Sequence, residues 1–358
     1  MADSELIVTT SYEVPDAGEE GGMLRLAGRD VRLDPARGSI AGILAVLRRV
    51  KEEGLPIAVR VDADGIVEDV RLPLVGHVVR LEGDERRLEL ELDTSHALLR
   101  LGKESLGLAP VLRRALAVGV PVIVTVDDAS RIIDARPFVL DPEGPLPPLP
   151  PLRPPFPPRR PWFVPIWELL RHLLRWPWWP WWWWFGLSRA RAQQLFDQLA
   201  TLSCAPLTVP APCIPFLYPD DGCWGRAHEM SRLLIAKGVT PGKVWIRGGL
   251  RVATRNNPTC AVRWGWHVAP TVIVRRFPWL SRRMVIDPSL FATPVTEAVW
   301  KGVQGDPAAT LTQTSWTKFS DWYPTDPTYV ETNRVLAQYR AALQLRSLQQ
   351  GPPPYSNC

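Results

Sequence analysis

The segment 141–161 most limits how this chain can fold, because 11 of its 21 residues are proline. Proline fixes the backbone φ angle and has no N–H donor, so a run this dense is excluded from helices and sheets. We expect an extended polyproline II spacer, although such a segment can also be a ligand for a proline-binding domain. The chain of 358 residues should therefore fold as separate parts on either side of this linker.

The expected parts differ in composition. In chain order they are an N-terminal repeat domain (1–140), the Pro-rich linker (141–161), a Trp-rich segment (162–187), a C-terminal domain (188–350) and a tail (351–358). Nine of the 17 tryptophans fall within 162–185, where residues 166–176 have helical spacing and Pro177 ends the helix. Two interpretations stay open: the rings pack on a neighbouring domain, or they contact a membrane interface or a partner protein.

The N-terminal part contains an internal repeat. Residues 54–62 (GLPIAVRVD) match residues 119–127 (GVPVIVTVD) at an offset of 65. Each copy has the pattern of a strand, a helix with apolar residues three and four apart, and two alternating strands around a turn. We therefore predict an α+β domain made of two β-α-β-β repeats. Its His77 and His96 stand apart from any other catalytic group, and structural or surface roles are expected for both.

The two halves of the chain carry opposite net charge. Residues 1–140 contain 18 basic and 24 acidic residues, a net charge of −6, whereas residues 141–358 contain 24 and 13, a net charge of +11. This distribution argues against a nucleic-acid-binding protein, which would be uniformly basic. The opposite charges should attract the two halves to each other.

The sequence does not decide the compartment. The first residues lack the basic and apolar pattern of a signal peptide, and no apolar run is long enough to predict a transmembrane helix. A cytoplasmic location is the default expectation, with non-classical secretion left open.

The five cysteines are too few for a disulfide scaffold in a chain of this length. They stand at 204, 213, 223, 260 and 358. Four of them could pair and leave one free, or all five could be reduced. If a disulfide forms, Cys204 with Cys213, nine residues apart, is the favoured pair. No set of cysteines and histidines has the sequence spacing of a zinc site, so we expect neither a metal nor a cofactor.

The segment 220–230 (DDGCWGRAHEM) places a cysteine at the start of an expected helix. Asp221 is a good N-cap residue, and the helical pattern runs to a stop at Gly238. Cys223 is then in the first turn, where backbone N–H groups and the helix dipole stabilise a thiolate and lower the thiol pKa. A cysteine at this position can also be a small packed residue, so the position alone does not identify a nucleophile.

Two later residues are suited to activate a cysteine. His267 lies inside an expected strand over 261–274, and it could be the general base for Cys223. Asp287 ends another expected strand and precedes a proline, where its carboxylate could orient the imidazole. The order cysteine, histidine, aspartate on a helix start and two successive strands fits papain-like and transglutaminase-like folds.

Four motifs together resemble the bacterial protein-glutaminase family. They are Asp-Gly-Cys-x-x-Arg-Ala-His-x-Met at 221–230, Lys-Val-Trp-Ile at 243–246, Trp-Gly-x-His-Val-Ala-Pro at 264–270 and Ile-Asp-Pro-Ser-Leu-Phe at 286–291. The resemblance implies that 188–350 is a catalytic domain with a transglutaminase-like (papain-like) core. It also implies deamidation of protein-bound glutamine to glutamate through a thioester, with Cys223 as nucleophile, His267 as base and Asp287 as its orienting partner.

Further roles follow for residues within these motifs. Trp224 and Trp266 are expected to line the substrate site and exclude water from it, with core packing as the alternative. Backbone N–H groups at the helix start, including that of Cys223, are expected to stabilise the oxyanion. Arg226 and His228 are expected to secure the helix.

The alternatives to a deamidase are a transglutaminase, which passes the same thioester to an amine, a cysteine peptidase, and a non-enzymatic membrane- or partner-binding protein with an inactive core. The expected partner of the enzyme is a protein or peptide with an accessible glutamine. The N-terminal domain is expected either to cover and inhibit the site or to serve targeting or substrate binding.

Overall fold

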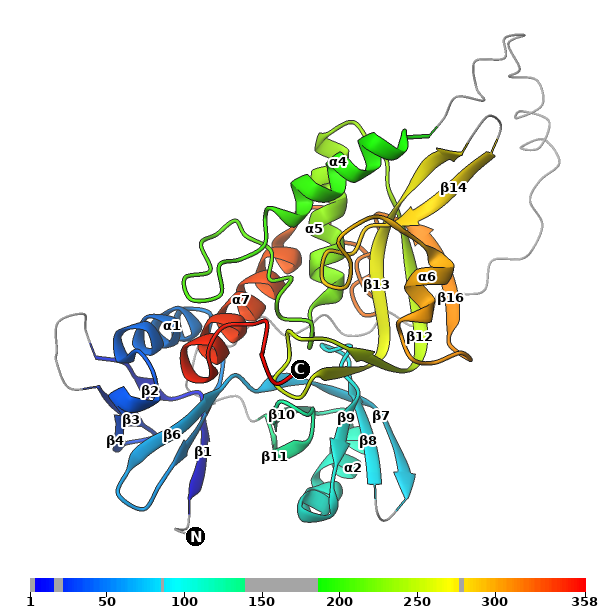
Figure 1. Cartoon of the computed structure of the whole chain (residues 1–358). Coiled ribbons are helices and arrows are strands. Elements are labelled where there is room, and N and C mark those ends of the chain that lie inside the picture. The colour runs from blue at the N-terminus through cyan, green and yellow to red at the C-terminus, as the bar shows by residue number, and fades with distance from the viewer. Residues whose placement is uncertain (1–3, 16–21, 85–86, 139–185, 277–279) are drawn as a thin grey trace.

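The computed structural model describes residues 4–15, 22–84, 87–138, 186–276 and 280–358. The Pro-rich linker and residues 162–185 of the Trp-rich segment lie outside these ranges, so the spacer and the membrane or partner contact remain predictions. No helix within the described ranges is long and apolar enough to cross a membrane. Two N-terminal sheets and one C-terminal sheet, with helices packed on them, make up the described fold (Figure 1).

The first N-terminal unit is a six-stranded sheet in the order β1-β5-β6-β4-β3-β2. Helix α1 (Ile40–Glu52) begins after Ser39, whose hydroxyl accepts a hydrogen bond from the Gly42 N–H, and its apolar face packs on the sheet. The strands are β1 (Glu5–Thr9), β2 (Tyr12–Glu13), β3 (Met23–Leu26), β4 (Arg29–Leu33), β5 (Ile57–Val61) and β6 (Ile66–Arg71).

The second N-terminal unit is a five-stranded sheet in the order β11-β10-β7-β8-β9, with helix α2 (Ala109–Val118) on it. Gly119 adopts the left-handed conformation and ends α2. The strands are β7 (Leu74–Asp84), β8 (Arg87–Leu92), β9 (Leu99–Leu101), β10 (Pro121–Val126) and β11 (Ile132–Pro137). The two units have separate apolar cores.

The C-terminal part is an antiparallel sheet in the order β15-β14-β13-β12-β16. Apolar residues of three helices pack together with β13 in one core, and Trp300 of a fourth helix, α6, packs in another. The elements are α4 (Arg189–Ala200), α5 (Cys223–Ala236), β12 (Gly242–Ala253), β13 (Ala261–Arg276), β14 (Leu280–Val285), β15 (Val295–Thr296), α6 (Glu297–Gly302), β16 (Thr310–Ser315) and α7 (Val330–Gln350).

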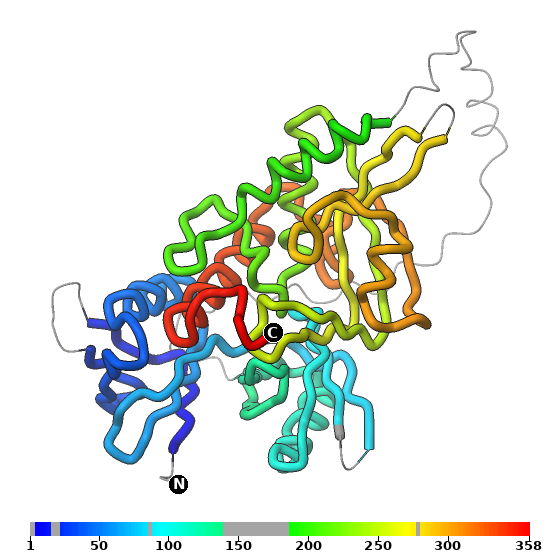
Figure 2. Tube along the Cα trace, viewed as in Figure 1, coloured from blue at the N-terminus to red at the C-terminus, as the bar shows by residue number. Residues whose placement is uncertain are grey.

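Helix α7 joins the C-terminal part to the first N-terminal unit (Figure 2). Its residues Ala341 and Leu345 belong to the core of that unit. Gln349 donates to and accepts from the backbone of Val70 on β6, at 2.9 and 2.8 Å. The halves of the chain are therefore packed on each other, and not merely tethered by the linker.

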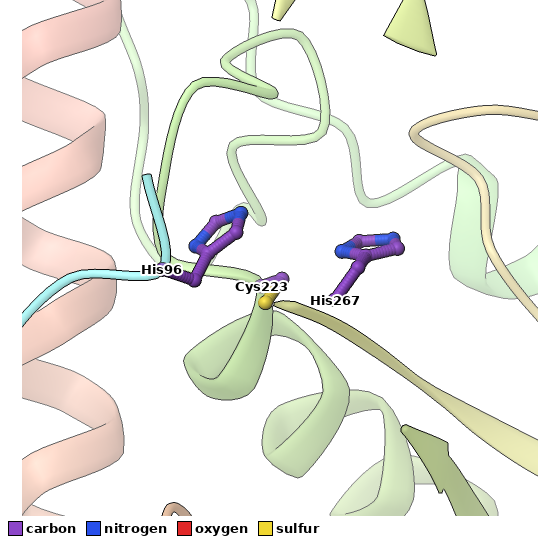
Figure 3. Close-up of side chains that lie close together, drawn as sticks. All are labelled: His96, Cys223 and His267. Carbon is purple, nitrogen blue, oxygen red and sulfur yellow. The ribbon is translucent and has the colours of Figure 1, made fainter. Parts of the chain in front are cut away.

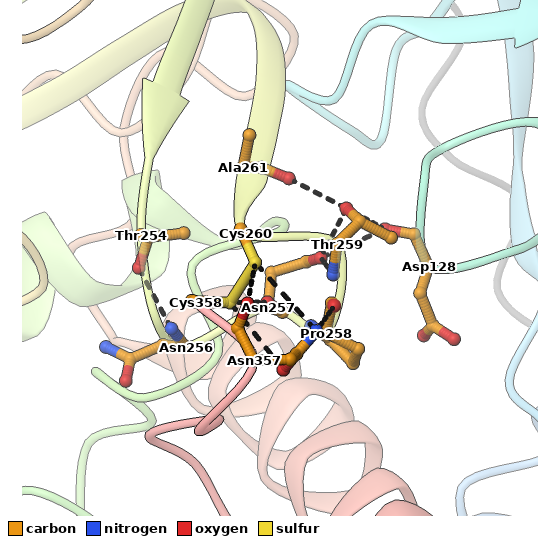
Figure 4. The surroundings of a disulfide bond; sticks show 10 residues. All are labelled: Asp128, Thr254, Asn256, Asn257, Pro258, Thr259, Cys260, Ala261, Asn357 and Cys358. Carbon is orange, nitrogen blue, oxygen red and sulfur yellow. Dashed lines mark hydrogen bonds between the residues drawn. A yellow bond between two sulfur atoms is a disulfide. The ribbon is translucent and has the colours of Figure 1, made fainter.

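Two disulfides are present. Cys204–Cys213 is the pair favoured from the sequence, and Cys260–Cys358 attaches the tail to the β12–β13 turn (Figure 4). Beside the second disulfide, the Asn257 side-chain amide donates to the backbone oxygen of Asp128 in the second N-terminal unit, at 3.0 Å. Cys223 remains a free thiol.

Candidate active site

Helix α5 begins at Cys223, where the sequence predicts a helix start. The preceding residue, Gly222, has a φ of 80°, in the left-handed region that favours glycine. A Cβ on Gly222 would lie 2.3 Å from Cδ2 of Tyr339, so the packing also requires glycine. The turn at Gly222 places the Cys223 side chain in the first helical turn, where the residue is only 1% exposed.

Asp221 is not the N-cap that the sequence predicts, because Gly222 occupies that position and no side chain caps the helix. Its carboxylate instead accepts hydrogen bonds from Ser95 Oγ at 2.5 Å and from the His96 backbone N–H at 3.1 Å. The cap prediction is wrong because donors from the N-terminal half, 125 residues away in sequence, take the carboxylate.

The structure brings His267 and Asp287 into contact. His267 Nε2 on β13 lies 2.9 Å from Asp287 Oδ2, just beyond the end of β14. Burial raises the pKa of Asp287, but the charge of His267 and hydrogen bonds from His267 and Trp300 outweigh it and hold the pKa below its usual value. Because Nε2 faces the carboxylate, Nδ1 is the ring nitrogen left for Cys223.

Trp300 is a residue that sequence reasoning missed. Its indole Nε1 donates to Asp287 Oδ2 at 2.9 Å, and its ring stacks on His267 with centroids 5.4 Å apart. Trp264 stacks on the imidazole too, at 4.4 Å. These contacts fix the orientation of both the carboxylate and the imidazole. Trp300 lies outside the four motifs, and no local sequence pattern indicates this role.

His96 is the second missed residue, and the expectation that it stands alone is wrong. It is 1% exposed, and its ring lies among those of Trp224, Trp264 and Trp266, with centroids 5.2 to 5.9 Å apart. Figure 3 shows the His96 and His267 imidazoles on either side of the Cys223 thiol. Trp224 and Trp266, the tryptophans expected to line the substrate site, therefore lie against the imidazole of His96.

Residues 95–98, here called the cover segment, hold His96 in place through backbone pairing with β13. The Gly265 N–H donates to His96 O at 2.9 Å, and the Leu98 N–H donates to Arg263 O at 3.0 Å. This edge of β13 is open to the cover segment because β14 pairs only with Thr271–Arg276. The cover segment thus forms an isolated antiparallel bridge to β13, between Ala97 and Trp264, beside the site.

Burial is the largest cause of the pKa shifts of Cys223 and His96. It raises the pKa of the Cys223 thiol, so the lowered pKa expected from the helix start is wrong for this covered arrangement. Burial also lowers the pKa of His96 to about 4, so its imidazole is neutral near pH 7. In this buried arrangement the cysteine is therefore a protonated thiol near pH 7.

Arg226 and His228 secure helix α5 from within. The Arg226 guanidinium donates to the backbone oxygens of Tyr218 and Asp221, at 3.0 and 2.6 Å. His228 Nδ1 lies 2.9 Å from the Lys243 amine, and His228 Nε2 lies 3.2 Å from Asp326 O. These side chains therefore bind neighbouring loops and strand β12, in agreement with the expected supporting role.

Comparison with known proteins places these residues in a family context. A family model described as Glutaminase matches residues 192–304. A crystal structure of protein-glutaminase is 32% identical over 43% of this chain and 88% of its own chain, with a TM-score of 0.39. The NMR structure of protein-glutaminase from Chryseobacterium proteolyticum is 31% identical over 48% of this chain and 97% of its own, with a TM-score of 0.40.

A crystal structure of pro-protein-glutaminase is 22% identical over 79% of this chain and 97% of its own, with a TM-score of 0.49. No curated protein sequence matches this chain.

Proposed function

Because this chain belongs to the protein-glutaminase family, we propose that it is a hydrolase that deamidates protein-bound glutamine to glutamate and releases ammonia. The family membership rests on sequence identity across most of the length of two protein-glutaminases. The observation that carries the proposal for this chain is the buried constellation of Cys223 at a helix start with the His267–Asp287 pair.

The proposed reaction begins when His267 Nδ1 removes the proton from the Cys223 thiol. The thiolate attacks the side-chain carbonyl carbon of glutamine, and backbone N–H groups at the start of α5 stabilise the oxyanion. The proton on His267 passes to the departing ammonia, which leaves a thioester. His267 then takes a proton from water, and the hydroxide attacks the thioester to release glutamate and the cysteine. Asp287 holds the imidazole and stabilises its protonated form.

Trp224 and Trp266 are proposed to form the walls of the substrate site. Both rings are less than a tenth exposed, and they enclose the position of the His96 ring. A glutamine side chain that entered this position would lie beside the Cys223 thiol and out of bulk water. Exclusion of water strengthens the charge interactions in the site and limits side reactions.

The N-terminal domain is proposed to inhibit the enzyme by covering this site. The cover segment takes the free edge of β13, its His96 fills the space between the tryptophans, and Asp221 fixes it there. A substrate segment cannot reach Cys223 while these contacts persist. Opening of the cover is therefore the step that precedes catalysis.

The proposed function is tested with a glutamine-rich protein substrate, by ammonia release and by the mass change of glutamine to glutamate. Ala97→Arg should open the cover, because Ala97 is 5% exposed and lies opposite Trp264. We expect its rate to exceed that of the wild type by about tenfold, the effect of ~1.4 kcal/mol on opening. Val120→Arg, at a more exposed site of the same domain, is the matched control.

Cys223→Ala in the Ala97→Arg background shows whether the ammonia release comes from this protein or from a contaminating enzyme. Ammonia release should disappear, and retained release would refute the assignment. Addition of a primary amine distinguishes the transglutaminase alternative, because crosslinked or amine-modified glutamine would then replace glutamate as the main product.

A further inference from the structure

Cys223, His96 and His267 form a cluster of three side chains that the proposed reaction does not need as a set. Each offers a metal-ligating atom, these atoms lie within 4.8 Å of one another, and all three residues are buried. The imidazoles come from different halves of the chain and face one thiol (Figure 3). No zinc spacing is visible along the sequence, because His96 reaches the site only through the fold.

Each imidazole is held by a buried carboxylate through one of its two nitrogens. Asp221 Oδ1 lies 2.6 Å from His96 Nδ1, and Asp287 Oδ2 lies 2.9 Å from His267 Nε2. In metal sites a carboxylate commonly orients a ligating histidine in this way and raises its basicity. The His267 ring is hydrogen-bonded to its carboxylate, and the His96 ring has its carboxylate at contact distance, so in each ring the second nitrogen faces away from the carboxylate.

The second nitrogens are buried and lack hydrogen-bond partners. His96 Nε2 and His267 Nδ1 find none among the described residues. Buried polar atoms are nearly always paired, so two such atoms beside one thiol suggest a missing partner. A ligand that accepts two nitrogen lone pairs and one thiolate is a cation with an affinity for nitrogen and sulfur.

We propose that the covered form of the protein binds one Zn²⁺ through Cys223 Sγ, His96 Nε2 and His267 Nδ1, with water as fourth ligand. Zinc prefers cysteine and histidine ligands in a tetrahedral arrangement, whereas Mg²⁺ and Ca²⁺ prefer oxygen. Binding breaks the S–H bond of Cys223, forms the S–Zn bond and releases the proton to solvent, without any change of oxidation state. Zn–N and Zn–S bonds of about 2.1 and 2.3 Å require ligand atoms roughly 3.5 Å apart, so the cluster must contract by about 1 Å.

The fold supplies an approach for the ion and a means of contraction. A cavity of about 60 Å³ lined by Thr94, Ser95, Trp224 and Trp266 adjoins the cluster. His96 lies between β8 and β9, outside either strand, and its imidazole can approach the other two ligands by side-chain rotation while the backbone pairing with β13 is kept. When the cover opens, only Cys223 and His267 remain together, so the complete site exists only in the covered form.

The regulatory consequence rests on the proposed function. Zinc would occupy the nucleophile and the base at once, and it would bind the cover segment to the catalytic half. Zn²⁺ would then keep the enzyme latent, and a chelator would favour opening. Metal binding itself depends only on the three side chains and not on the reaction they catalyse.

The experiment uses the purified, metal-free full chain. After addition of Zn²⁺, native mass spectrometry should show one Zn²⁺ per chain, and Co²⁺ added in its place should produce the near-ultraviolet absorption of a cobalt–thiolate bond. His96→Ala and, independently, Cys223→Ser should each weaken Zn²⁺ binding by at least about 100-fold in competition with a chromogenic chelator. Cys223→Ser replaces only the sulfur atom by oxygen, so this variant still tests zinc binding if His96→Ala does not fold.

His77→Ala is the matched control, because His77 is in the same domain, contacts Asp93 at 2.9 Å and lies outside the cluster. Its Zn²⁺ affinity should equal that of the wild type. Absence of bound metal in the wild type, or undiminished binding by a folded His96→Ala or Cys223→Ser variant, overturns the proposal. Ammonia release by the Ala97→Arg variant without zinc binding by the wild type overturns only this inference. Zinc binding by the wild type without ammonia release by the zinc-free Ala97→Arg variant overturns only the proposed function.

Discussion

Cys223 shows how burial can reverse the effect of a local sequence signal. A helix N-terminus stabilises a thiolate by about 0.5–2 kcal/mol, whereas removal of a charged group from water costs several kcal/mol. With the cover segment in place, burial therefore dominates and the pKa of the thiol is raised. Opening of the cover would restore the influence of the helix on the cysteine.

Asp287→Asn should reduce kcat by roughly 10³–10⁴-fold in the Ala97→Arg background, with little change of KM. The amide cannot stabilise a protonated His267, although Trp300 can still donate to its oxygen. Ammonia-release kinetics measure the effect. Asp197→Asn, at an exposed position of α4, is the control and should leave kcat unchanged. A kcat for Asp287→Asn close to that of the control would contradict the role of Asp287.

Gly222→Ala should destabilise the fold by about 2–4 kcal/mol, the sum of a left-handed alanine and an overpacked contact. Gly238→Ala, at the other end of α5, isolates the backbone cost, because Gly238 has a φ of 76° and an added Cβ there would have no atom within 4 Å. Urea unfolding compares the two variants. Equal losses would show that contact with Tyr339 adds nothing.

At the scale of elements, the sequence predicts those helices and strands whose pattern lies within a few neighbouring residues. The start of α5 and the strand that carries His267 follow from turn residues, helical spacing and β-branched runs within a few positions. Strand β16 was missed because nearly all of its residues are exposed and carry no apolar alternation. Helix α6 starts at Glu297, directly after the two-residue strand β15.

The incomplete site prediction has a different physical cause. His96 comes within reach of Cys223 through backbone pairing of the cover segment with β13, which is far away in sequence, and no local pattern encodes such pairing. Helix α7 likewise buries residues around its circumference, because it packs on both halves of the chain, so it lacks a single apolar face. Sequence patterns therefore located the chemical groups of the catalytic half, whereas the cover of the site required the fold.

The two disulfides should contribute unequally to stability. In the chain-entropy account, closure of the 98-residue separation of Cys260–Cys358 is worth about 5 kcal/mol, and closure of the nine-residue separation of Cys204–Cys213 about 3 kcal/mol. Replacement of both Cys260 and Cys358 by serine should lower the free energy of unfolding more than replacement of both Cys204 and Cys213. Thermal and urea unfolding of each double variant provide the measurement, and the reverse order would exclude loop entropy as the main effect.

At the scale of the whole molecule, the opposite charges of the two halves meet in a partly buried network. Arg346 of α7 binds Asp220 at 2.8 Å and Asp128 of the second N-terminal unit at 3.3 Å. Arg71 reaches the same Asp128 carboxylate at 3.2 Å. Buried ion pairs are weak evidence for net stability, but loss of one partner is costly because the other charge is left unpaired. The network therefore favours one docking arrangement of the halves.

Asp128→Asn should loosen this docking near pH 7. Arg346 would keep Asp220 and Arg71 would keep Asp69, so the expected cost is only about 1.4 kcal/mol, or tenfold in opening. Hydrogen–deuterium exchange of the cover segment and the rate of ammonia release should both rise by about that factor. Asp134→Asn is the matched control, since Asp134 pairs locally with Arg136 on the same strand.

The same carboxylate predicts how docking depends on pH. Burial raises the pKa of Asp128, but the charges of Arg346 and Arg71 outweigh burial and hold the pKa below its usual value. A carboxylate with a lowered folded pKa stabilises docking fully above its unfolded pKa of about 3.9, and this contribution is lost as the pH falls through the lower folded value. Exchange in the cover segment of the wild type, compared with Asp128→Asn at each pH, should therefore differ by about tenfold near neutrality and converge only in strong acid. Convergence already near pH 6 would show that a group other than Asp128 controls the docking.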